Sequence, residues 1–378
     1  MDSRVVVVRA DEAPQRGIER PGPHQTYKNP RVSVERRRLP RLHPDDIRVE
    51  MLYAGICGTD VHLATADPAT GYILGSAPAR IPRAGRVMGH EGVGRVVEIG
   101  RRVRHIRPGA YVAFESIVVC HYCDACRRGN FNQCRNSALL GMERDGIFGD
   151  VVDVPSLIAH DVSDLAGSER GRKSAACIEP AAIAFVACQN AGLAAGDVAV
   201  IFGAGPIGYY AAMLGRAVFG ASEVHVVEKV PFRRAKAGRW SDAQYDVPGF
   251  EGRGPADIDV AIEASGAMEN IRRCITRLRP NGRIVILGRG GEPLRIDATD
   301  HMITNEISLK GSRGHLGGAF ASIIALCRKG RLRLDDAVTG IVHGPEGVRR
   351  LLENPRKLLE AHCKVLVKFG RGCRPRAG

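Results

Sequence analysis

The sequence predicts an α/β protein of two domains, one rich in β-strands and one built on a doubly wound parallel sheet. Its 378 residues exceed what one ordinary hydrophobic core holds. Short apolar or alternating runs between glycines occupy residues 46–56, 93–99 and 110–115, which is typical of a β-rich domain. Beyond residue 191, strand-like and helix-like segments alternate, and this pattern favours a parallel sheet.

The second half of the chain carries continuous apolar runs that fit strands buried on both faces. The predicted strands are 198–202, 224–228, 258–263, 283–287 and 307–310. A helix is expected over residues 206–219, another after residue 317, and a closing strand over residues 364–369. The stretch between residues 228 and 257 looks short, as if a helix were trimmed. Residues 371–378 look like a frayed terminus.

We therefore expect three segments in two domains. Residues 1–183 form the β-rich domain, residues 184–317 form the parallel-sheet domain, and residues 318–378 return to the first. A cysteine-rich lobe at about residues 117–136 projects from the β-rich domain.

Composition excludes several classes of protein. Hydrophobic residues make up 44% and charged residues 25%, as in ordinary globular proteins. No apolar run reaches the roughly 20 residues that span a bilayer, and no leader pattern is present, so we expect a cytoplasmic protein without membrane contact. The net charge is +14, but the arginines are scattered and aromatic residues are only 5%. Nucleic-acid binders concentrate basic charge on one face, so we expect no nucleic-acid partner, while an acidic or phosphorylated substrate stays open.

A glycine-rich turn, Gly203-Ala-Gly205-Pro206-Ile207-Gly208, follows the strand at 198–202 and opens the next helix. In this context Gly203 permits the tight turn, Gly205 lets the backbone approach a pyrophosphate, and Gly208 lets the helix pack on the strand. The helix N-terminus then faces the phosphates. The motif predicts a dinucleotide site.

An acidic residue, Glu228, ends the second predicted strand about 20 residues later, as such a site requires. A carboxylate there accepts hydrogen bonds from the ribose hydroxyls and repels a 2′-phosphate, which favours NAD over NADP. The basic neighbours Lys229, Arg233 and Arg234 keep NADP open, and Arg233 is a candidate cofactor contact.

Four cysteines lie close together as Cys120-x2-Cys123-x2-Cys126-x7-Cys134. Clustered thiols in a long chain indicate metal binding in a reducing compartment rather than disulfides. Four thiolates close a tetrahedral shell around Zn2+, which is typical of a structural site. An iron–sulfur cluster is the alternative.

A second set of metal-binding residue types lies earlier in the chain, in Cys57-Gly-Thr59-Asp60-Val-His62 and Gly89-His90-Glu91. Cys57, His90 and a carboxylate would supply three ligands and leave a position for water or a substrate alcohol. That open position is typical of a catalytic zinc.

These motifs and their order resemble the zinc-containing medium-chain alcohol/polyol dehydrogenases over nearly the whole chain. The series is completed by Glu179-Pro180, which stands before the glycine turn. The resemblance implies a GroES-like catalytic domain and a Rossmann coenzyme domain. It further implies one catalytic and one structural Zn2+ per subunit, NAD as cofactor, and a homodimer or homotetramer.

The resemblance also assigns roles to residues of the second set. It implies that Cys57 and His90 are catalytic zinc ligands, with Glu91 or Glu179 ligating according to the state of the site. Glu179 stands where the sorbitol and glucose dehydrogenase branch carries Glu, and nearby Cys177 ranks below it as a ligand.

The implied chemistry is alcohol oxidation. Zinc lowers the pKa of the substrate hydroxyl, Thr59 accepts its proton and passes it through the cofactor ribose towards His62, and hydride goes to the nicotinamide. Asp60 matches the acid that supports the zinc-bound histidine.

The stretch from Thr65 to Arg86 is longer than is usual for the family and should border the substrate cleft. Tyr72 and Ser76 are therefore candidate substrate contacts. Arg313 and His315, after the last strand of the parallel sheet, are further candidates.

We expect the substrate to be a secondary alcohol or ketone of a polyol, sugar, cyclitol or aminocyclitol. The Arg-, Ala- and Gly-rich composition also suits specialised biosynthesis in a high-GC bacterium. A simple aliphatic or aromatic alcohol is the alternative substrate. A non-catalytic NAD-binding relative is a second class, although the proposed ligands and Thr59 are all present. A zinc-finger-type nucleic-acid binder is a third, and it leaves Cys57, His90 and the glycine turn unexplained.

Overall fold

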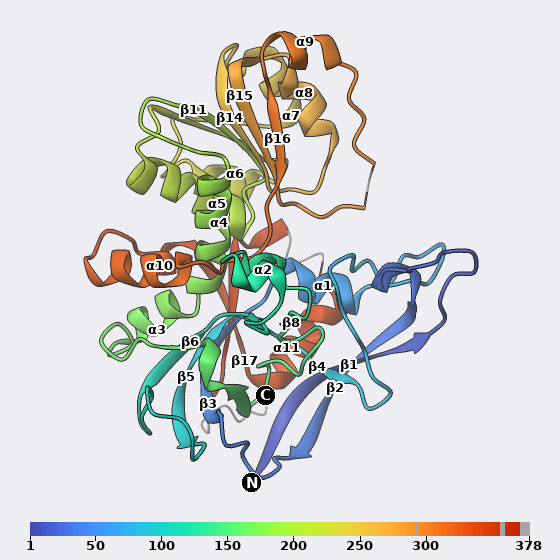
Figure 1. Ribbon diagram of the computed structural model, residues 1–378, viewed down its shortest axis with the longest axis vertical. Helices are drawn as coiled ribbons and strands as arrows, with labels where there is room; N and C mark the ends of the chain where they lie inside the picture. The colour runs from blue at the N-terminus through green and yellow to red at the C-terminus, as the bar shows by residue number, and fades with distance from the viewer. Residues whose placement is uncertain (292, 356–359, 371–378) are drawn as a thin grey trace. The chain divides into compact units, whose positions relative to one another are not determined.

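The computed structural model describes residues 1–291, 293–355 and 360–370. The chain divides into two compact units (Figure 1). Unit 1 comprises Met1–Glu179, Arg333–Leu358 and Lys364–Gly378, and unit 2 comprises Pro180–Leu332 and Leu359–Cys363. The division differs from the expected one at residues 180–183, 318–332 and 360–363, which belong to unit 2 by their contacts. The predicted frayed terminus at 371–378 lies outside the described residues.

Unit 1 is rich in β-structure, as predicted. A three-stranded sheet has the order β2-β1-β4, a larger sheet has the order β10-β6-β5-β3-β18-β17 with β9 paired to β3, and β7 pairs with β8. The strands are β1 (Asp2–Glu12), β2 (Tyr27–Arg38), β3 (Asp46–Gly55), β4 (Arg86–Val87), β5 (Gly92–Ile99), β6 (Tyr111–Phe114), β7 (Ile117–Val118), β8 (Ala138–Leu139), β9 (Val151–Pro155), β10 (Ala159–Asp161), β17 (Val338–His343) and β18 (Lys364–Lys368). The helices are α1 (Gly58–Ala64), α2 (Asp124–Arg127), α3 (Glu169–Ala175) and α11 (Gly344–Glu353).

The closing strand of unit 1 lies beside a strand from the first sixth of the chain. β18 runs antiparallel to β3, with Leu366 opposite Gly55, and the backbone N–H of Ile56 donates to the carbonyl of Val365 at 3.0 Å. The strands enclose one apolar core, in which Met51, Phe114 and Phe148 are fully buried. This pairing brings Lys364 next to the residues that precede Cys57.

Unit 2 is a doubly wound parallel sheet, which confirms the predicted fold class. The strand order is β13-β12-β11-β14-β15-β16, and helices flank the sheet (Figure 1). The strands are β11 (Val198–Phe202), β12 (Glu223–Val227), β13 (Ala243–Tyr245), β14 (Ile258–Glu263), β15 (Leu278–Ile286) and β16 (Ser308–Gly311). The helices are α5 (Pro206–Leu214), α6 (Pro231–Ala237), α7 (Val247–Arg253), α8 (Glu269–Ile275), α9 (Thr299–Thr304) and α10 (Ala319–Arg328), and α4 (Ile178–Asn190) links the units along the chain.

The strand order reverses between β11 and β14, and doubly wound sheets bind ligands outside the carboxyl ends of the strands at such a point. The glycine turn begins there, directly after β11. The predicted helix at 206–219 is present, but its last turn, Gly215–Phe219, is a π-helix. The stretch in which a trimmed helix was expected holds two helices of seven residues each, α6 and α7, with β13 between them.

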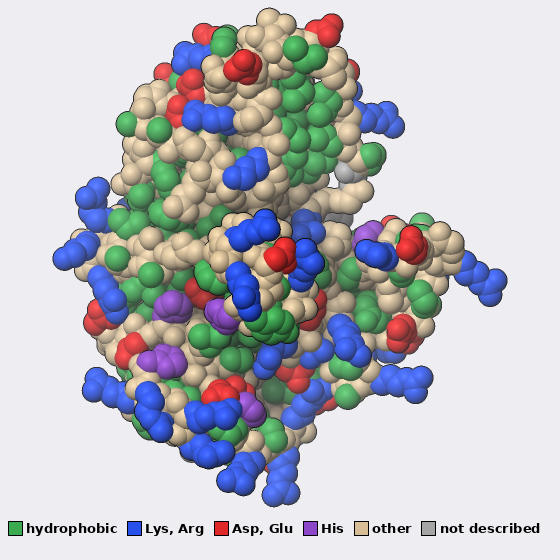
Figure 2. Space-filling model, in the orientation of Figure 1, with side chains coloured by type: hydrophobic (Ala, Val, Ile, Leu, Met, Phe, Trp, Pro, Cys, Tyr) green, Lys and Arg blue, Asp and Glu red, His purple; other side chains and the backbone are tan. Residues whose placement is uncertain are grey.

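Charged side chains of both signs are mixed on the surface drawn in Figure 2. Several arginines are held in ion pairs, as Arg48 is with Glu98 and Asp153 at 2.8 Å. No helix among the described residues is both long and apolar enough to cross a membrane.

Candidate catalytic and metal sites

The four clustered cysteines converge in a lobe of unit 1 that the β7–β8 pair closes at its base. Their sulfur atoms all lie within 4.8 Å of one another. Cys134 Sγ is 3.5 Å from Cys120 Sγ and 4.0 Å from Cys123 Sγ. Four sulfurs bound to a tetrahedral zinc at about 2.3 Å lie about 3.8 Å apart. The set therefore fits one zinc ion, and it leaves no room for the several irons of a cluster.

The surroundings of Cys120 favour the thiolate that zinc requires. Desolvation raises the pKa of this thiol, but hydrogen bonds from the backbone N–H groups of Tyr122 and Cys123 outweigh it and lower the pKa to about 6. Within the same set, burial raises the pKa of Cys126 to about 12. Burial likewise raises the pKa values of Cys188 and Cys274 to about 12. Those two thiols lie in unit 2 and act as apolar core side chains.

The second donor set comes from two segments of unit 1. Cys57 precedes α1, whereas His90 and Glu91 lie between β4 and β5. One ligand atom from each of the three lies within 4.8 Å of the others. Glu91 Oε2 is buried and has no hydrogen-bond partner among the residues that the structure describes. Such an atom is costly to bury unless a cation or donor satisfies it, so the set fits a divalent metal ion.

Asp60 lies behind this donor set, on α1. It is 1% exposed, and its Oδ2 accepts a hydrogen bond from the backbone N–H of Cys57 at 2.9 Å. Its Oδ1 lies 3.8 Å from His90 Nδ1. The carboxylate thus fixes the turn that carries Cys57 and lies beside the imidazole.

Glu179 and Cys177 are buried but fall outside the group of atoms within 4.8 Å. Glu179 Oε1 accepts a hydrogen bond from the hydroxyl of Ser116 at 2.8 Å. Burial raises the pKa of Glu179 to about 7, and a divalent cation nearby would oppose that rise. Ser116 is a contact that the sequence did not reveal.

Lys364 is a second residue that sequence reasoning missed. Its ammonium forms an ion pair with Glu91 Oε1 and donates to the carbonyl of Ile56 at 2.9 Å. Burial lowers the pKa of Lys364, but Glu91 more than compensates and raises it above its usual value, so the side chain is a cation. The signal available in the sequence was a lysine at the start of a strand whose centre, Val365 to Val367, is apolar.

Thr59 and His62 lie one helical turn apart on α1, where residues three apart share a face. Thr59 Oγ1 lies 3.8 Å from Cys57 Sγ. His62 is half-buried, and burial lowers its pKa from the usual value. The ring is therefore neutral at pH 7 and able to accept a proton.

The glycine turn in unit 2 has the geometry of a phosphate-binding loop. Gly203 has φ +92°, and an added Cβ at Gly208 would lie 1.8 Å from the carbonyl oxygen of Gly203. At Gly205 an added Cβ would meet only Arg233 Nη1, at 3.9 Å. Space for a pyrophosphate therefore lies beside Gly205, at the start of α5, with Pro206 and Ile207 in its first turn.

Glu228 closes this loop from the end of β12. It is 7% exposed, Oε2 accepts from the backbone N–H of Ala204 at 2.7 Å, and Oε1 accepts from that of Val230 at 2.9 Å. Arg233 donates to the carbonyl of His362 and Arg234 to that of Glu228, both at 2.8 Å. Both arginines are thus engaged by backbone carbonyls.

The loop from Thr65 to Arg86 in unit 1 contacts the β1–β2 hairpin. The hydroxyl of Tyr72 donates to the carbonyl of Ala13 at 2.8 Å, and Lys28 Nζ lies 4.3 Å from the centre of its ring. Ser76 is half-buried. These contacts give Tyr72 a part in holding the loop.

The two candidates after β16 belong to unit 2. His315 is fully buried with its ring 5.8 Å from that of Phe320, and Arg313 is half-buried. Arg289 lies near Arg313. Burial, and to a smaller extent the positive charge of Arg313, lower the pKa of Arg289.

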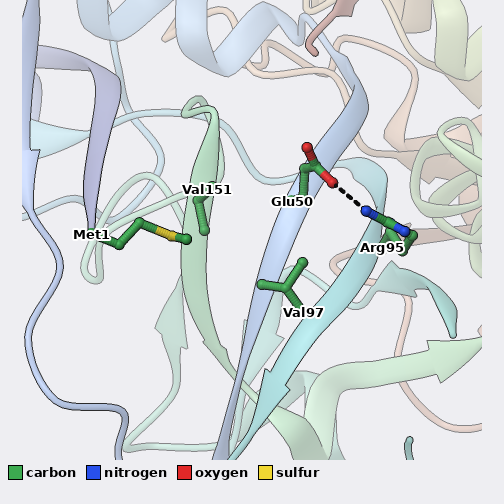
Figure 3. A pocket seen from close by; sticks show the side chains of 5 residues that line it. All are labelled: Met1, Glu50, Arg95, Val97 and Val151. Atoms are coloured by element: carbon green, nitrogen blue, oxygen red, sulfur yellow. Dashed lines mark hydrogen bonds and ion pairs between the residues drawn. The ribbon is translucent and has the colours of Figure 1, made fainter. Parts of the chain in front are cut away.

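A surface hollow of about 230 Å³ lies on the larger sheet of unit 1 (Figure 3). It is lined by Met1, Glu50, Arg95, Val97 and Val151. An ion pair of 3.0 Å joins Arg95 to Glu50, as Figure 3 shows. None of these five residues belongs to the predicted site.

Comparison with known proteins agrees with both units. The alcohol dehydrogenase GroES-like domain matches residues 43–164, and the zinc-binding dehydrogenase domain matches residues 206–329. An L-threonine 3-dehydrogenase of Pyrococcus horikoshii is 32% identical over 314 residues, which cover 80% of this chain and 85% of that protein. A probable D-xylulose reductase A of Emericella nidulans is 29% identical over 329 residues, covering 82% and 87%. The structure of a putative alcohol dehydrogenase from Thermotoga maritima matches with a TM-score of 0.86 and 26% identity, covering 97% of this chain and all of the other.

The chain therefore belongs to the zinc-dependent medium-chain alcohol/polyol dehydrogenases. It is an oxidoreductase of small molecules, with zinc and NAD as its cofactors. The family, the enzyme class and the two kinds of cofactor predicted from the sequence are confirmed.

Proposed function

We propose that the protein oxidises a secondary alcohol of a polyol, sugar, cyclitol or aminocyclitol, or reduces the matching ketone, at a catalytic zinc held by Cys57, His90 and Glu91. Two observations carry the proposal: these three donors converge, and the buried Oε2 of Glu91 has no hydrogen-bond partner among the described residues. Glu179, rather than a cysteine, at the neighbouring buried position supports the polyol branch. The two relatives, named for L-threonine and D-xylulose, support a secondary alcohol or ketone as the reacting group.

The residues around Cys57 have distinct parts in this reaction. When bound, zinc lowers the pKa of a hydroxyl group and NAD accepts hydride. Thr59 supplies a hydroxyl beside Cys57 that receives the substrate proton, and His62, neutral and one turn further on, is the next proton acceptor. Asp60 holds the Cys57 turn in place.

A second zinc in the four-cysteine lobe would bring the count to two per chain. Four sulfurs within 4.8 Å support a closed, structural site. These thiols have to stay reduced to hold metal, so we place the protein in the cytoplasm.

We further propose that the cofactor site of unit 2 prefers NAD to NADP. The buried carboxylate of Glu228 at the end of β12 supports this, because it would repel a 2′-phosphate. The engagement of Arg233 and Arg234 by backbone carbonyls supports it as well.

A homo-oligomer is also proposed, formed through the edge strand β16. All four residues of β16 are exposed, including Leu309 at 36%, and Ile303 on the preceding helix α9 is 76% exposed. Figure 2 shows hydrophobic side chains gathered on the drawn face of unit 2. An exposed edge strand with apolar neighbours is a template for pairing with another chain. Light scattering of Leu309→Lys tests this, since the variant should be smaller in mass than the wild type.

The function is tested by following NADH absorbance with polyols, cyclitols, amino sugars and simple alcohols, alongside zinc per chain. Two zincs and NAD reduction on a polyhydroxylated substrate are expected. Turnover confined to simple aliphatic or aromatic alcohols would overturn the substrate class, and no turnover on any alcohol with either cofactor would overturn the assignment of the site.

A further inference from the structure

A fully buried ion pair joins Lys364 to Glu91, one of the three proposed catalytic donors. Lys364 and Glu91 have side-chain exposures of 1% and 0%. Lys364 has a second acceptor, the carbonyl of Ile56, which lies just before Cys57. Buried charges are unfavourable unless each is paired, so the two side chains depend on each other.

Gly55 makes room for this pair. A Cβ added there would lie 2.7 Å from Lys364 Nζ and 2.7 Å from Glu91 Cδ. Gly55 is in β3 and is not among the glycines with positive φ, so its backbone conformation does not require glycine. The space itself is therefore the reason for a glycine at this position.

The two oxygens of Glu91 have different surroundings. Oε1 is held by Lys364, whereas Oε2 is buried and finds no hydrogen-bond partner in the described part of the chain. The same carboxylate contributes a ligand atom to the group with Cys57 and His90. Glu91 thus faces two cations: the ammonium group of Lys364, and the metal ion that the donor group would bind.

A catalytic zinc needs one position free for its substrate. Cys57, His90 and one oxygen of Glu91 would leave that position in a tetrahedral shell, whereas the second oxygen of Glu91 would fill it. A cation in contact with one carboxylate weakens its attraction to the metal, and in a buried site that effect is strong. Glu179, by contrast, accepts a hydrogen bond from the neutral hydroxyl of Ser116.

We propose that Lys364 is a positioning residue that holds Oε1 of Glu91 away from the catalytic metal, so that Glu91 contributes one oxygen and one coordination position stays available to the substrate hydroxyl. This inference rests on the proposed catalytic zinc. Lys364 acts through Glu91 and does not itself contact the reacting atoms.

The test compares Lys364→Met with the wild-type enzyme, both loaded with Co2+ in place of zinc. The rate at which a chelator removes metal from the Cys57 site and the visible spectrum of that site are measured, together with KM. Without Lys364 the whole Glu91 carboxylate turns to the metal. We expect metal release to slow by about tenfold or more, as for other changes around metal ligands, with a changed spectrum and a raised KM. Release from the four-cysteine lobe stays the same.

Lys368→Met is the matched control. Lys368 is on the same strand, is 40% exposed and pairs with Glu169 at 3.4 Å. Its loss should leave both release rates and KM at wild-type values. Equal release from Lys364→Met and the wild type would overturn the proposal.

Glu91→Gln shows whether Lys364 acts through Glu91. In that background, adding Lys364→Met should no longer slow metal release, and a slowing that persists would contradict the proposed route. If Lys364→Met does not fold, Lys364→Gln takes its place, because it removes the charge and keeps a hydrogen-bond donor. A wild-type chain that holds metal in the lobe alone would refute the proposed function, whereas two metals with unchanged release from Lys364→Met would refute this inference alone.

Discussion

The two metal-donor sets of unit 1 are built in opposite ways. In the lobe, four cysteines within 15 residues supply four equivalent sulfurs, and each lies within 4.8 Å of the others. At Cys57 the donors are a thiol, an imidazole and a carboxylate from two segments, with Asp60, Glu179 and Lys364 buried around them. One set is complete in itself, and the other depends on its surroundings.

The difference separates a stabilising site from a reactive one. Four thiolates around a metal would leave no position for a substrate, so we propose that the lobe contributes to folding. The mixed set has three near donors and a fourth held by Ser116, which suits a site that must accept and release a ligand. The charged side chains around the donors therefore affect metal binding at the Cys57 site, and not in the four-cysteine lobe.

The largest effect is expected from Cys57→Ser. Loss of this donor should reduce kcat/KM about 1,000-fold or more, because the metal that activates the substrate is no longer held. Steady-state kinetics and metal analysis measure this, with Cys327→Ser, a half-buried cysteine of α10, as the control. Retained activity in Cys57→Ser would show that the two sets had been assigned wrongly.

Cys134→Ser should act on stability instead. The loss of the lobe metal should lower the midpoint of thermal unfolding by roughly 5 °C or more, since structural zinc binding contributes folding free energy. Calorimetry of the variant, purified in the presence of zinc, tests this. An unchanged unfolding midpoint together with a loss of activity would show that the roles of the two sites are the reverse of those proposed.

Gly55→Ala and Gly58→Ala compare two glycines near Cys57, one in a crowded position and one in open space. An added Cβ at Gly55 meets the Lys364–Glu91 pair at 2.7 Å, whereas at Gly58 it meets nothing within 4 Å. Overpacking of this kind costs about 1–3 kcal/mol of unfolding free energy. Urea denaturation should show that loss for Gly55→Ala and none for Gly58→Ala, and equal values would remove the argument that Gly55 makes room for the pair.

The glycine turn of unit 2 offers a smaller and similar contrast. Gly205→Ala places a methyl group in open space, so the fold should be unchanged while KM for NAD rises about tenfold, which corresponds to about 1.4 kcal/mol. Gly208→Ala would bring a methyl group 1.8 Å from the Gly203 carbonyl and should lower the melting temperature. A normal KM for Gly205→Ala would place the pyrophosphate elsewhere.

Local patterns in the sequence predicted much of this structure. The spacing of the four cysteines and the glycine turn between strand and helix depend on neighbours in the chain, and both have the expected local geometry. Five of the six parallel strands were predicted from their apolar runs, whereas β13, Ala243–Tyr245, carries no such run and was not predicted.

Lys364 could not be predicted in this way. Lys364 and Lys368 stand four residues apart, on the same face of β18, and alternation alone treats them alike. The structure buries one and leaves the other 40% exposed, because β18 pairs with β3 and brings Lys364 to Glu91. The contacts of Tyr72 with Ala13 and Lys28 are hidden from the sequence for the same reason.

The central claim is that one site is structural and the other catalytic, and staged removal of metal tests it most directly. Zinc per chain and enzyme activity are followed together while a chelator acts on the native protein. Two zincs per chain are predicted at the start, with one lost quickly together with all activity and the other retained until the protein unfolds. A single zinc per chain, or full activity after the fast zinc has left, would contradict the account.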